Sequence, residues 1–370
     1  MKVVYLADIR IPTEKAHGIQ IMKMCEAFSC EKTEVELIVP NRKNGIKADP
    51  FEYYKVKNNF LIKKINVFNF DYFKFCHFNL IISSIAFIFS AKIYLYNKKF
   101  NILYVRDPYY GLFFKNTYLE LHNVKNTHNY FYKKSLKLFT KIFVLTSYIK
   151  NELIKIGVNE DNIIITPDGV DLEKFNNNII QAEAKRKLGL PQDKKLILYT
   201  GHLYSWKGTD TLADTARFFG KDVEFIFVGG TENDLALFKE KYSTIKNIKI
   251  IGQKPHSVIP LYLAAADVLV LPNSGKEDIS RYYTSPLKLF EYMTSGRPIV
   301  ASDLPSIREI LNEDNAVFFE SDNSESLASA IKKVLSDNEL ARKISEKALV
   351  DVQNYSWKKR AENIIRKIEL

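Results

Sequence analysis

One carboxylate and one short polar loop have the residue types and spacing needed to hold a nucleoside diphosphate. The loop follows a short apolar strand and ends at Thr284, Ser285 and Pro286, where we predict a helix with Ser285 as N-cap and Pro286 at its first position. The free N–H groups at a helix start suit a diphosphate. Glu291, one turn into the helix, can accept two hydrogen bonds from a ribose diol. The same pattern also fits a strand–loop–helix unit without a ligand.

Four further side chains are placed by the strand pattern where they could take part in the same chemistry. Lys207 lies in the loop HLYSWKG after the strand LILYTG, within reach of a diphosphate. Lys288 either adds a second cation or is a solvated helix lysine. Arg106 and His122 follow the apolar strands of NILYVRD and TYLELHNV, and carboxyl ends of parallel strands meet at one edge of a sheet. A lone histidine at a strand end is more often structural than catalytic.

The elements that must position these residues alternate along the whole chain. Apolar strands of five to eight residues alternate with helical segments, which predicts an α/β protein with parallel sheets. The length of 370 residues suits two domains. A boundary is expected near 175–192, where asparagines and Pro191 interrupt the pattern. The most apolar run, Leu80 to Phe89, is too short to span a bilayer, and we favour a buried crossover helix over a membrane-dipping one.

Two segments resemble a known enzyme family. SPLKLFEYMTSGRPIVASDLPSIREI resembles the nucleotide-sugar signature of the retaining glycosyltransferases of family 4, and DNIIITPDGVDLEKF resembles the segment that closes their first domain. The resemblance implies the GT-B fold, an α/β architecture of two facing Rossmann-like domains with parallel sheets and a donor cleft between them. It implies an acceptor-binding domain over 1–178, a nucleotide-sugar-binding domain over 179–355, and a C-terminal helix over 356–370 that crosses back to the first domain.

The resemblance also implies roles for individual residues. Glu291 matches the second glutamate of the family's Glu-x7-Glu motif, which binds the donor ribose, but Tyr283 replaces the first glutamate and His202 replaces a usual arginine. His122 and Lys207 are the implied catalytic residues, and Arg106 lies on the acceptor side. The implied donor-binding residues are Gly18, His202, Lys207, Gly252, Lys254, Tyr283, Thr284, Ser285, Pro286, Leu287, Lys288 and Glu291.

The implied activity is transfer of a sugar from a nucleoside diphosphate sugar to an acceptor hydroxyl with retention at the anomeric carbon, in the synthesis of a surface polysaccharide or glycolipid. No cofactor is expected. The sequence has no Asp-x-Asp motif, and the family needs no catalytic metal. Two alternatives stay open. One is a sugar-nucleotide epimerase, because such enzymes also use this fold. The other is a catalytically silent nucleotide-binding subunit, because Tyr283 and His202 depart from the family pattern.

Charge is unevenly distributed. Residues 1–178 hold 26 Lys and Arg against 17 Asp and Glu, and the remainder holds 28 against 26. No nucleic-acid-binding motif accompanies this excess, so the candidates are an anionic membrane surface and a solvated lysine-rich surface. The expected acceptor is a glycan or a lipid-linked glycan. Three cysteines without metal-ligand spacing predict reduced, buried thiols. The N-terminus shows no leader pattern, so we expect a cytoplasmic protein. Contact of the basic first half with an anionic membrane would place it at the inner face.

Overall fold

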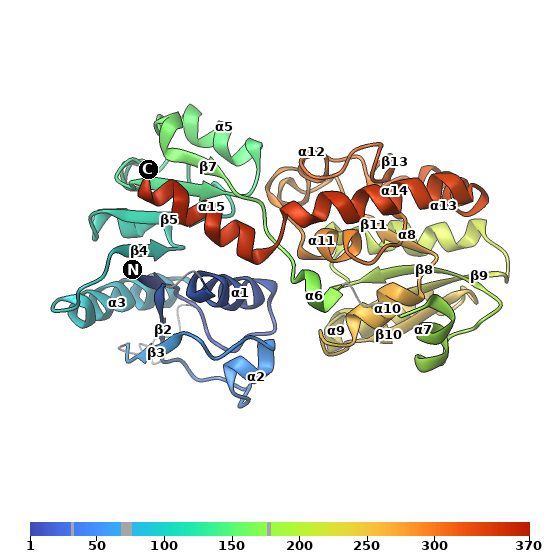
Figure 1. Ribbon diagram of the computed structural model, residues 1–370, viewed down its shortest axis with the longest axis horizontal. Coiled ribbons are helices and arrows are strands. Elements are labelled where there is room, and N and C mark those ends of the chain that lie inside the picture. Colours follow the sequence, from blue (N-terminus) through green and yellow to red (C-terminus); the bar gives the residue numbers. More distant parts are fainter. Residues whose placement is uncertain (31–32, 68–75, 176–178) are drawn as a thin grey trace. The chain divides into compact units, whose positions relative to one another are not determined.

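The chain forms two compact α/β units. The structure is a computed structural model that describes residues 1–30, 33–67, 76–175 and 179–370, with no side-chain description for 76–82. Unit 1 comprises Met1–Pro167 together with Trp357–Leu370, and unit 2 comprises Asp168–Ser356. The chain therefore passes from one unit to the other twice (Figure 1).

Unit 1 is built on a parallel sheet with the strand order β3-β2-β1-β4-β5-β6-β7. Parallel sheets are covered on both faces, so their strands are continuous apolar runs, as in VVYL and ILYV. β3 and β7 lie at the two edges of this sheet. The strands are β1 (Lys2–Leu6), β2 (Glu34–Pro40), β3 (Leu61–Ile65), β4 (Ile102–Val105), β5 (Thr117–Leu121), β6 (Lys141–Val144) and β7 (Ile163–Ile165).

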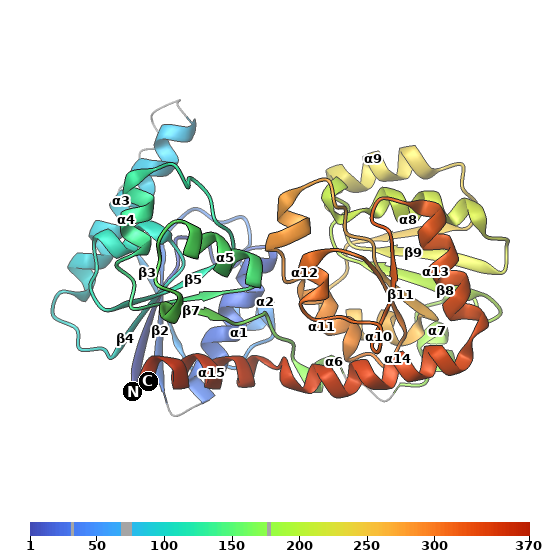
Figure 2. The ribbon, with the colours of Figure 1, turned by 90° about the horizontal axis from the view of Figure 1, so that it is seen from above.

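Helices cover both faces of this sheet. Figure 2 shows α1 and α15 on one face and α3 and α4 on the other, as right-handed crossovers require. The helices are α1 (Ala16–Cys30), α2 (Pro50–Tyr54), α3 (Cys76–Leu95), α4 (Tyr130–Leu136), α5 (Ser147–Lys155) and α15 (Trp357–Glu369), with 3-10 turns η1 (Pro108–Leu112) and η2 (Glu160–Asn162). The last helix, α15, packs beside α1 although it is separated from it by all of unit 2.

Unit 2 has a second parallel sheet, with the order β10-β9-β8-β11-β12-β13. Its apolar core lies on both faces of the sheet, beneath helices such as α11 and α13. The strands are β8 (Lys195–Thr200), β9 (Val223–Val228), β10 (Ile248–Gly252), β11 (Val268–Leu271), β12 (Ile299–Ser302) and β13 (Val317–Phe319). The switch between β8 and β11 is where strand order reverses, the usual place for a ligand in an open α/β sheet.

The helices of unit 2 are short apart from α9 and the last two. They are α6 (Leu172–Phe175), α7 (Gln181–Lys187), α8 (Thr209–Thr215), α9 (Glu232–Tyr242), α10 (Ile259–Ala265), α11 (Leu287–Met293), α12 (Pro305–Arg308), α13 (Ser324–Ser336) and α14 (Asn338–Asp351). Single turns are η3 (Ser205–Lys207), η4 (Ala216–Phe218) and η6 (Val352–Asn354), and η5 (Ile279–Tyr283) is a π-helical turn.

Three predictions about packing need correction. Residues 168–175 pack with unit 2, because Val170 and Phe175 belong to its core, so the units divide earlier than residue 178. Cys25 is buried as predicted, but Cys30 at the end of α1 is exposed. Helix α3 does cross over between strands, but it is buried on one face only. The side chain of Cys76 lies outside the described residues.

None of the helices in the described part of the chain combines the length and the hydropathy needed to span a lipid bilayer.

Candidate functional site

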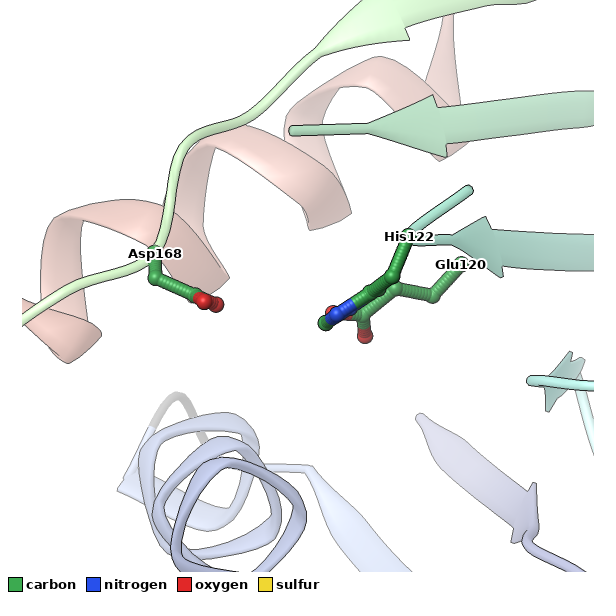
Figure 3. Close-up of side chains that lie close together, drawn as sticks. All are labelled: Glu120, His122 and Asp168. Carbon is green, nitrogen blue, oxygen red and sulfur yellow. The ribbon is translucent and has the colours of Figure 1, made fainter. Parts of the chain in front are cut away.

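The histidine predicted at a strand end in unit 1 is held by a buried carboxylate. β5 ends at Leu121, so Glu120 points into the interior with 1% of its surface exposed and His122 lies just beyond the carboxyl end of the strand. His122 Nε2 is 2.9 Å from Glu120 Oε1, and Figure 3 shows the imidazole lying against the carboxyl group. The Glu120–His122 pair therefore comes from one strand end, from residues two positions apart.

Three more side chains converge on the same carboxylate. Arg360 of α15 donates from NH2 to Glu120 Oε1 at 2.9 Å, and the Gln20 amide donates to the same oxygen. Tyr5 of β1 donates its hydroxyl proton to Oε2 at 3.2 Å. We call Glu120, His122, Arg360, Gln20 and Tyr5 the carboxylate network. All five belong to unit 1.

The network fixes the charge and the tautomer of the histidine. Burial by itself would raise the pKa of Glu120, but the Arg360 guanidinium and the hydrogen bond from His122 hold it well below its usual range. Burial, aided by the Arg106 cation, lowers the pKa of His122 to about 4. The carboxylate is therefore ionised and accepts only, so the neutral imidazole must donate from Nε2. His122 consequently presents Nδ1 as a proton acceptor.

Arg106 and Gly18 lie close to this network. Arg106 follows β4 and donates to the Gln20 side-chain oxygen, so it contacts the carboxylate network at Gln20. Gly18 lies in the first turn of α1, where an added Cβ would come 2.3 Å from the Tyr54 hydroxyl. That hydroxyl accepts from Thr13 N at 2.6 Å and donates to Thr13 O at 2.7 Å. Gly18 thus has a packing role in the loop before α1.

Unit 2 brings together the two predicted cations. Lys288, in the first turn of α11, is 9% exposed, and its ammonium has no hydrogen-bond partner among the described residues. Burial, and next the neighbouring Lys207 cation, lower the pKa of Lys288 well below its usual range, whereas Glu291 opposes the change. Burial lowers the pKa of Lys207 to about 7. We call Lys207 and Lys288 the lysine pair.

Aromatic faces take the place that acceptors would occupy around the lysine pair. Lys288 Nζ lies 3.8 Å from the centre of the Tyr199 ring, and Lys207 Nζ lies 3.7 Å from that of Trp206. Cation–π contacts leave an ammonium able to donate hydrogen bonds to an anion. Two desolvated cations near each other form a site for a multivalent anion such as a diphosphate.

Two glycines shape the loop after β8 around this pair. At Gly201, with φ of +130°, an added Cβ would come 3.1 Å from Lys288 Nζ, so the backbone leaves space directly at the ammonium. At Gly208, with φ of +67°, a Cβ would come 1.8 Å from the Pro272 carbonyl oxygen, so only glycine fits there. His202, which replaces the expected arginine, stacks on Tyr204 with ring centres 4.9 Å apart.

Glu291 is buried and oriented by two residues that sequence analysis did not identify. His256 Nε2 lies 2.7 Å from Glu291 Oε1, and Lys174 Nζ lies 2.9 Å from His256 Nδ1. An ammonium only donates, so His256 accepts at Nδ1 and donates from Nε2 to Glu291. The only sequence signal for His256 is its place in the loop after β10, at the same sheet edge as Gly252.

The polar segment before α11 differs from its prediction. α11 begins at Leu287 with Pro286 in the N-cap position and no capping side chain. Ser285 Oγ instead accepts a hydrogen bond from the backbone N–H of Asp168 at 3.1 Å. The predicted N-cap is therefore wrong, because the serine binds a neighbouring segment of unit 2. Tyr283 ends the π-helical turn η5, and Thr284 follows it in extended conformation.

The remaining predicted donor residues lie at the end of β10. Gly252 closes this strand with φ of +81° and accepts a hydrogen bond from Gly229 N at 2.8 Å. Lys254 is exposed in the loop that follows. Among the predicted residues, those of unit 2 thus cluster near the carboxyl ends of β8, β10 and β11, whereas Gly18, Arg106 and His122 belong to unit 1.

The part of the chain that carries the lysine pair and Glu291 is similar to a known family. Residues 180–350 match the model described as glycosyl transferases group 1. The match covers somewhat less than half of the chain and shows what this part of it is similar to. The matched residues, which we call the group 1 segment, make up most of unit 2.

The curated relatives of this chain are glycosyltransferases by name. A UDP-Gal:alpha-D-GlcNAc-diphosphoundecaprenol alpha-1,3-galactosyltransferase of Escherichia coli is 30% identical over 218 residues, 55% of this chain and 53% of that protein. A phosphatidyl-myo-inositol mannosyltransferase of Mycolicibacterium smegmatis is 27% identical over 210 residues, 55% of this chain and 50% of that protein. The match spans about half the length of these curated relatives.

Solved structures extend the likeness to both units. A sucrose-phosphate synthase from Thermosynechococcus elongatus superimposes with a TM-score of 0.77 at 18% identity, covering 99% of this chain and 97% of its own. Anabaena HepE, solved in complex with UDP, gives a TM-score of 0.75 at 14% identity and full coverage of both chains. At this identity the likeness shows the fold alone. The chain therefore has the predicted GT-B fold.

Proposed function

We propose that this chain is a retaining glycosyltransferase of family 4, which moves a sugar from a nucleoside diphosphate sugar to an acceptor hydroxyl. The observation that carries the proposal is the lysine pair. Lys288 is nine-tenths buried, without a hydrogen-bond partner among the described residues, and next to a second lysine of lowered pKa. A desolvated cation that lacks an anion is costly, and a donor diphosphate would supply that anion.

The donor is proposed to bind across unit 2. Glu291, already oriented by His256, would accept hydrogen bonds from the ribose hydroxyls. The lysine pair would hold the diphosphate. The backbone of residues 283–287 and His202, which directly follows Gly201, would complete the phosphate site. Gly252 and Lys254 lie at the next strand end, where they would contact the nucleobase. This division leaves the pair free to stabilise the charge that develops on the leaving diphosphate.

The reacting carbon is proposed to meet His122. In the reaction, the bond from the anomeric carbon to the diphosphate oxygen breaks and a bond to the acceptor oxygen forms on the same face. The proton of the acceptor hydroxyl passes to the departing diphosphate, which leaves as the nucleoside diphosphate. Neutral His122, with Nδ1 as acceptor, suits a position beside an oxocarbenium-like sugar because it adds no positive charge. Arg106, after β4, is proposed for the acceptor side, and Gly18, in the first turn of α1, for the side of the donor phosphates. No cofactor takes part in this scheme.

The proposed acceptor is a glycan or a lipid-linked glycan of a surface polysaccharide or glycolipid. The printed name of the Escherichia coli relative specifies a diphosphoundecaprenol-linked sugar as its acceptor. The basic excess of residues 1–178 suits contact with an anionic membrane, so we place the enzyme in the cytoplasm at the inner membrane face. Nucleic acid is not a proposed partner.

Ligand-dependent stability tests the donor site first. UDP, GDP, ADP and dTDP are each added to the full chain, and the base that fits should raise the melting temperature, because it binds the native state. The matching nucleotide sugars then separate three outcomes: transfer or hydrolysis supports the proposal, an epimerised nucleotide sugar supports an epimerase, and binding without turnover indicates a silent subunit. No shift with any of the four nucleotides would refute the donor site.

A further inference from the structure

Helix α3 carries apolar side chains on the face that points away from the sheet. Ile85, Phe89, Ile93 and Tyr96, just past its end, are 42%, 53%, 78% and 86% exposed. Their spacings of four, four and three residues place them on one face of the helix. The opposite face is buried against the sheet through Phe87, Ile88, Ala91 and Leu95. We call the four exposed residues the α3 stripe.

This arrangement is unusual for a helix on the surface of a globular domain. Such a helix normally has one apolar face toward the core and a polar face toward solvent. Contiguous exposed apolar residues indicate a contact surface. Phe113, which follows η1, extends the stripe, because its ring centre lies 6.1 Å from that of Phe89. The apolar surface therefore continues beyond the helix.

The stretch of sequence that contains the α3 stripe is strongly basic. Between residues 55 and 150 the sequence has 16 Lys and Arg against three Asp and Glu. Of the two described acids, Glu120 is buried in the carboxylate network and Asp107 caps η1. The α3 segment itself contains no acidic residue, and Lys92 is exposed on the striped face between Phe89 and Ile93. Two acids of other elements also contact this region, Asp8 at Ser84 and Glu36 at Tyr94 and Lys98, but their side chains are only 12% and 1% exposed.

We infer that the α3 stripe docks onto an anionic lipid bilayer. Isoleucine, phenylalanine and tyrosine side chains would enter the boundary between headgroups and acyl chains, while the lysines beside them meet lipid phosphates. Nucleic acid would use the lysines but offers no apolar phase for the aliphatic side chains of Ile85 and Ile93. The purpose of the contact, access to a lipid-linked acceptor, rests on the proposed function, but the surface itself does not.

Vesicle sedimentation of the full chain tests this inference. Vesicles of pure phosphatidylcholine are compared with vesicles that also contain phosphatidylglycerol, at low and high salt. The test variant is Phe89→Asn with Ile93→Asn, and the control is Leu237→Asn, which replaces an apolar side chain of α9 that is 69% exposed in unit 2. We expect the wild type and the control to bind the anionic vesicles, and the double variant to bind about tenfold or more weakly.

Three results would overturn the inference. These are equal sedimentation with both lipid compositions, unchanged binding by the double variant, and a wild-type dimer in light scattering that the double variant abolishes, which would assign the stripe to a second copy of the chain. UDP titration of the same preparations keeps the two proposals apart. Loss of vesicle binding with intact UDP binding concerns the stripe alone, and vesicle binding without any nucleotide binding would refute the proposed function alone.

Discussion

The two units treat buried charge in opposite ways. In unit 1, Glu120 is surrounded by donors, among them the guanidinium of Arg360 at 2.9 Å. In unit 2, Lys288 is buried to a similar depth, yet its ammonium faces the Tyr199 ring and has no hydrogen-bond partner among the described residues. The carboxylate network is complete within the chain, whereas the lysine pair is incomplete without an anion.

This difference separates a positioning device from a ligand site. A buried charge with a full set of hydrogen bonds holds its neighbours in one geometry, here the tautomer of His122. A buried charge without partners raises the free energy of the empty protein. This cost is offset when a ligand of opposite charge binds. Mutations that remove either charge should therefore have opposite effects on stability.

Glu120→Ala should produce the largest loss of stability. It leaves the buried Arg360 guanidinium without its carboxylate, which typically costs about 3–5 kcal/mol for a buried pair broken on one side. Urea unfolding of the full chain measures the change. Glu120→Gln keeps the shape and should lose less stability, while releasing the His122 tautomer. If Glu120→Ala unfolded at the same urea concentration as the wild type, the network would have no structural role.

Lys288→Met should leave stability unchanged or raise it, because the substitution removes a desolvated cation and keeps the aliphatic stem. The same change should weaken binding of the best nucleoside diphosphate about 10- to 100-fold, the effect of one lost hydrogen bond to a charged group. Calorimetry measures the affinity. Lys239→Met, on the exposed side of α9, is the matched control and should bind as the wild type does. Equal affinities for the two variants would remove Lys288 from the site.

Because of Lys207, we expect the stability of the empty protein and its affinity for a nucleoside diphosphate to change in opposite directions with pH. Its folded pKa of about 7 lies below that of the unfolded chain, so between pH 7 and about 10 the unfolded state binds more protons and stability rises with pH. The affinity for a diphosphate should fall as the pH is raised through 7, because the ammonium loses its charge. Melting curves and titrations from pH 6 to 9 check both trends. Lys207→Met should flatten them, and an unchanged slope would contradict the assignment.

His256→Ala should have the smallest effect. It removes one hydrogen bond that orients Glu291, so nucleotide affinity should fall by roughly 3- to 10-fold, the range of a single net hydrogen bond. Glu291→Ala removes the carboxylate itself and should cost more. A His256 variant that bound as weakly as the Glu291 variant would place the imidazole in direct contact with the ligand.

Much of the fold could be predicted from local patterns, and the site only in part. Apolar strands alternating with helices predicted both sheets, and the strand ending at Leu121 correctly placed His122 at a carboxyl end. The partner of Glu120 could not be predicted, because Arg360 lies 240 residues away along the chain. Its position follows from the packing of α15, which no local pattern contains.

Two local predictions failed for tertiary reasons. Ser285 has the residue type and position of an N-cap, but its hydroxyl oxygen accepts a hydrogen bond from the backbone N–H of Asp168 instead. The apolar run of α3 predicted a buried helix, and hydrophobicity alone could not show that the face of Ile93 is exposed. For Lys288 the sequence left open a second cation or a solvated helix lysine, because its low exposure depends on the packing of α11.

The placement of α15 also sets the order in which the molecule is completed during synthesis. Residues 1–167 leave the ribosome first, but the helix that supplies Arg360 to them begins only at Trp357. At 5–20 residues per second, roughly 10–40 s pass between the two. Unit 2 therefore has all of its residues before unit 1 does, and during that interval the nascent first unit must hold Glu120 without its arginine.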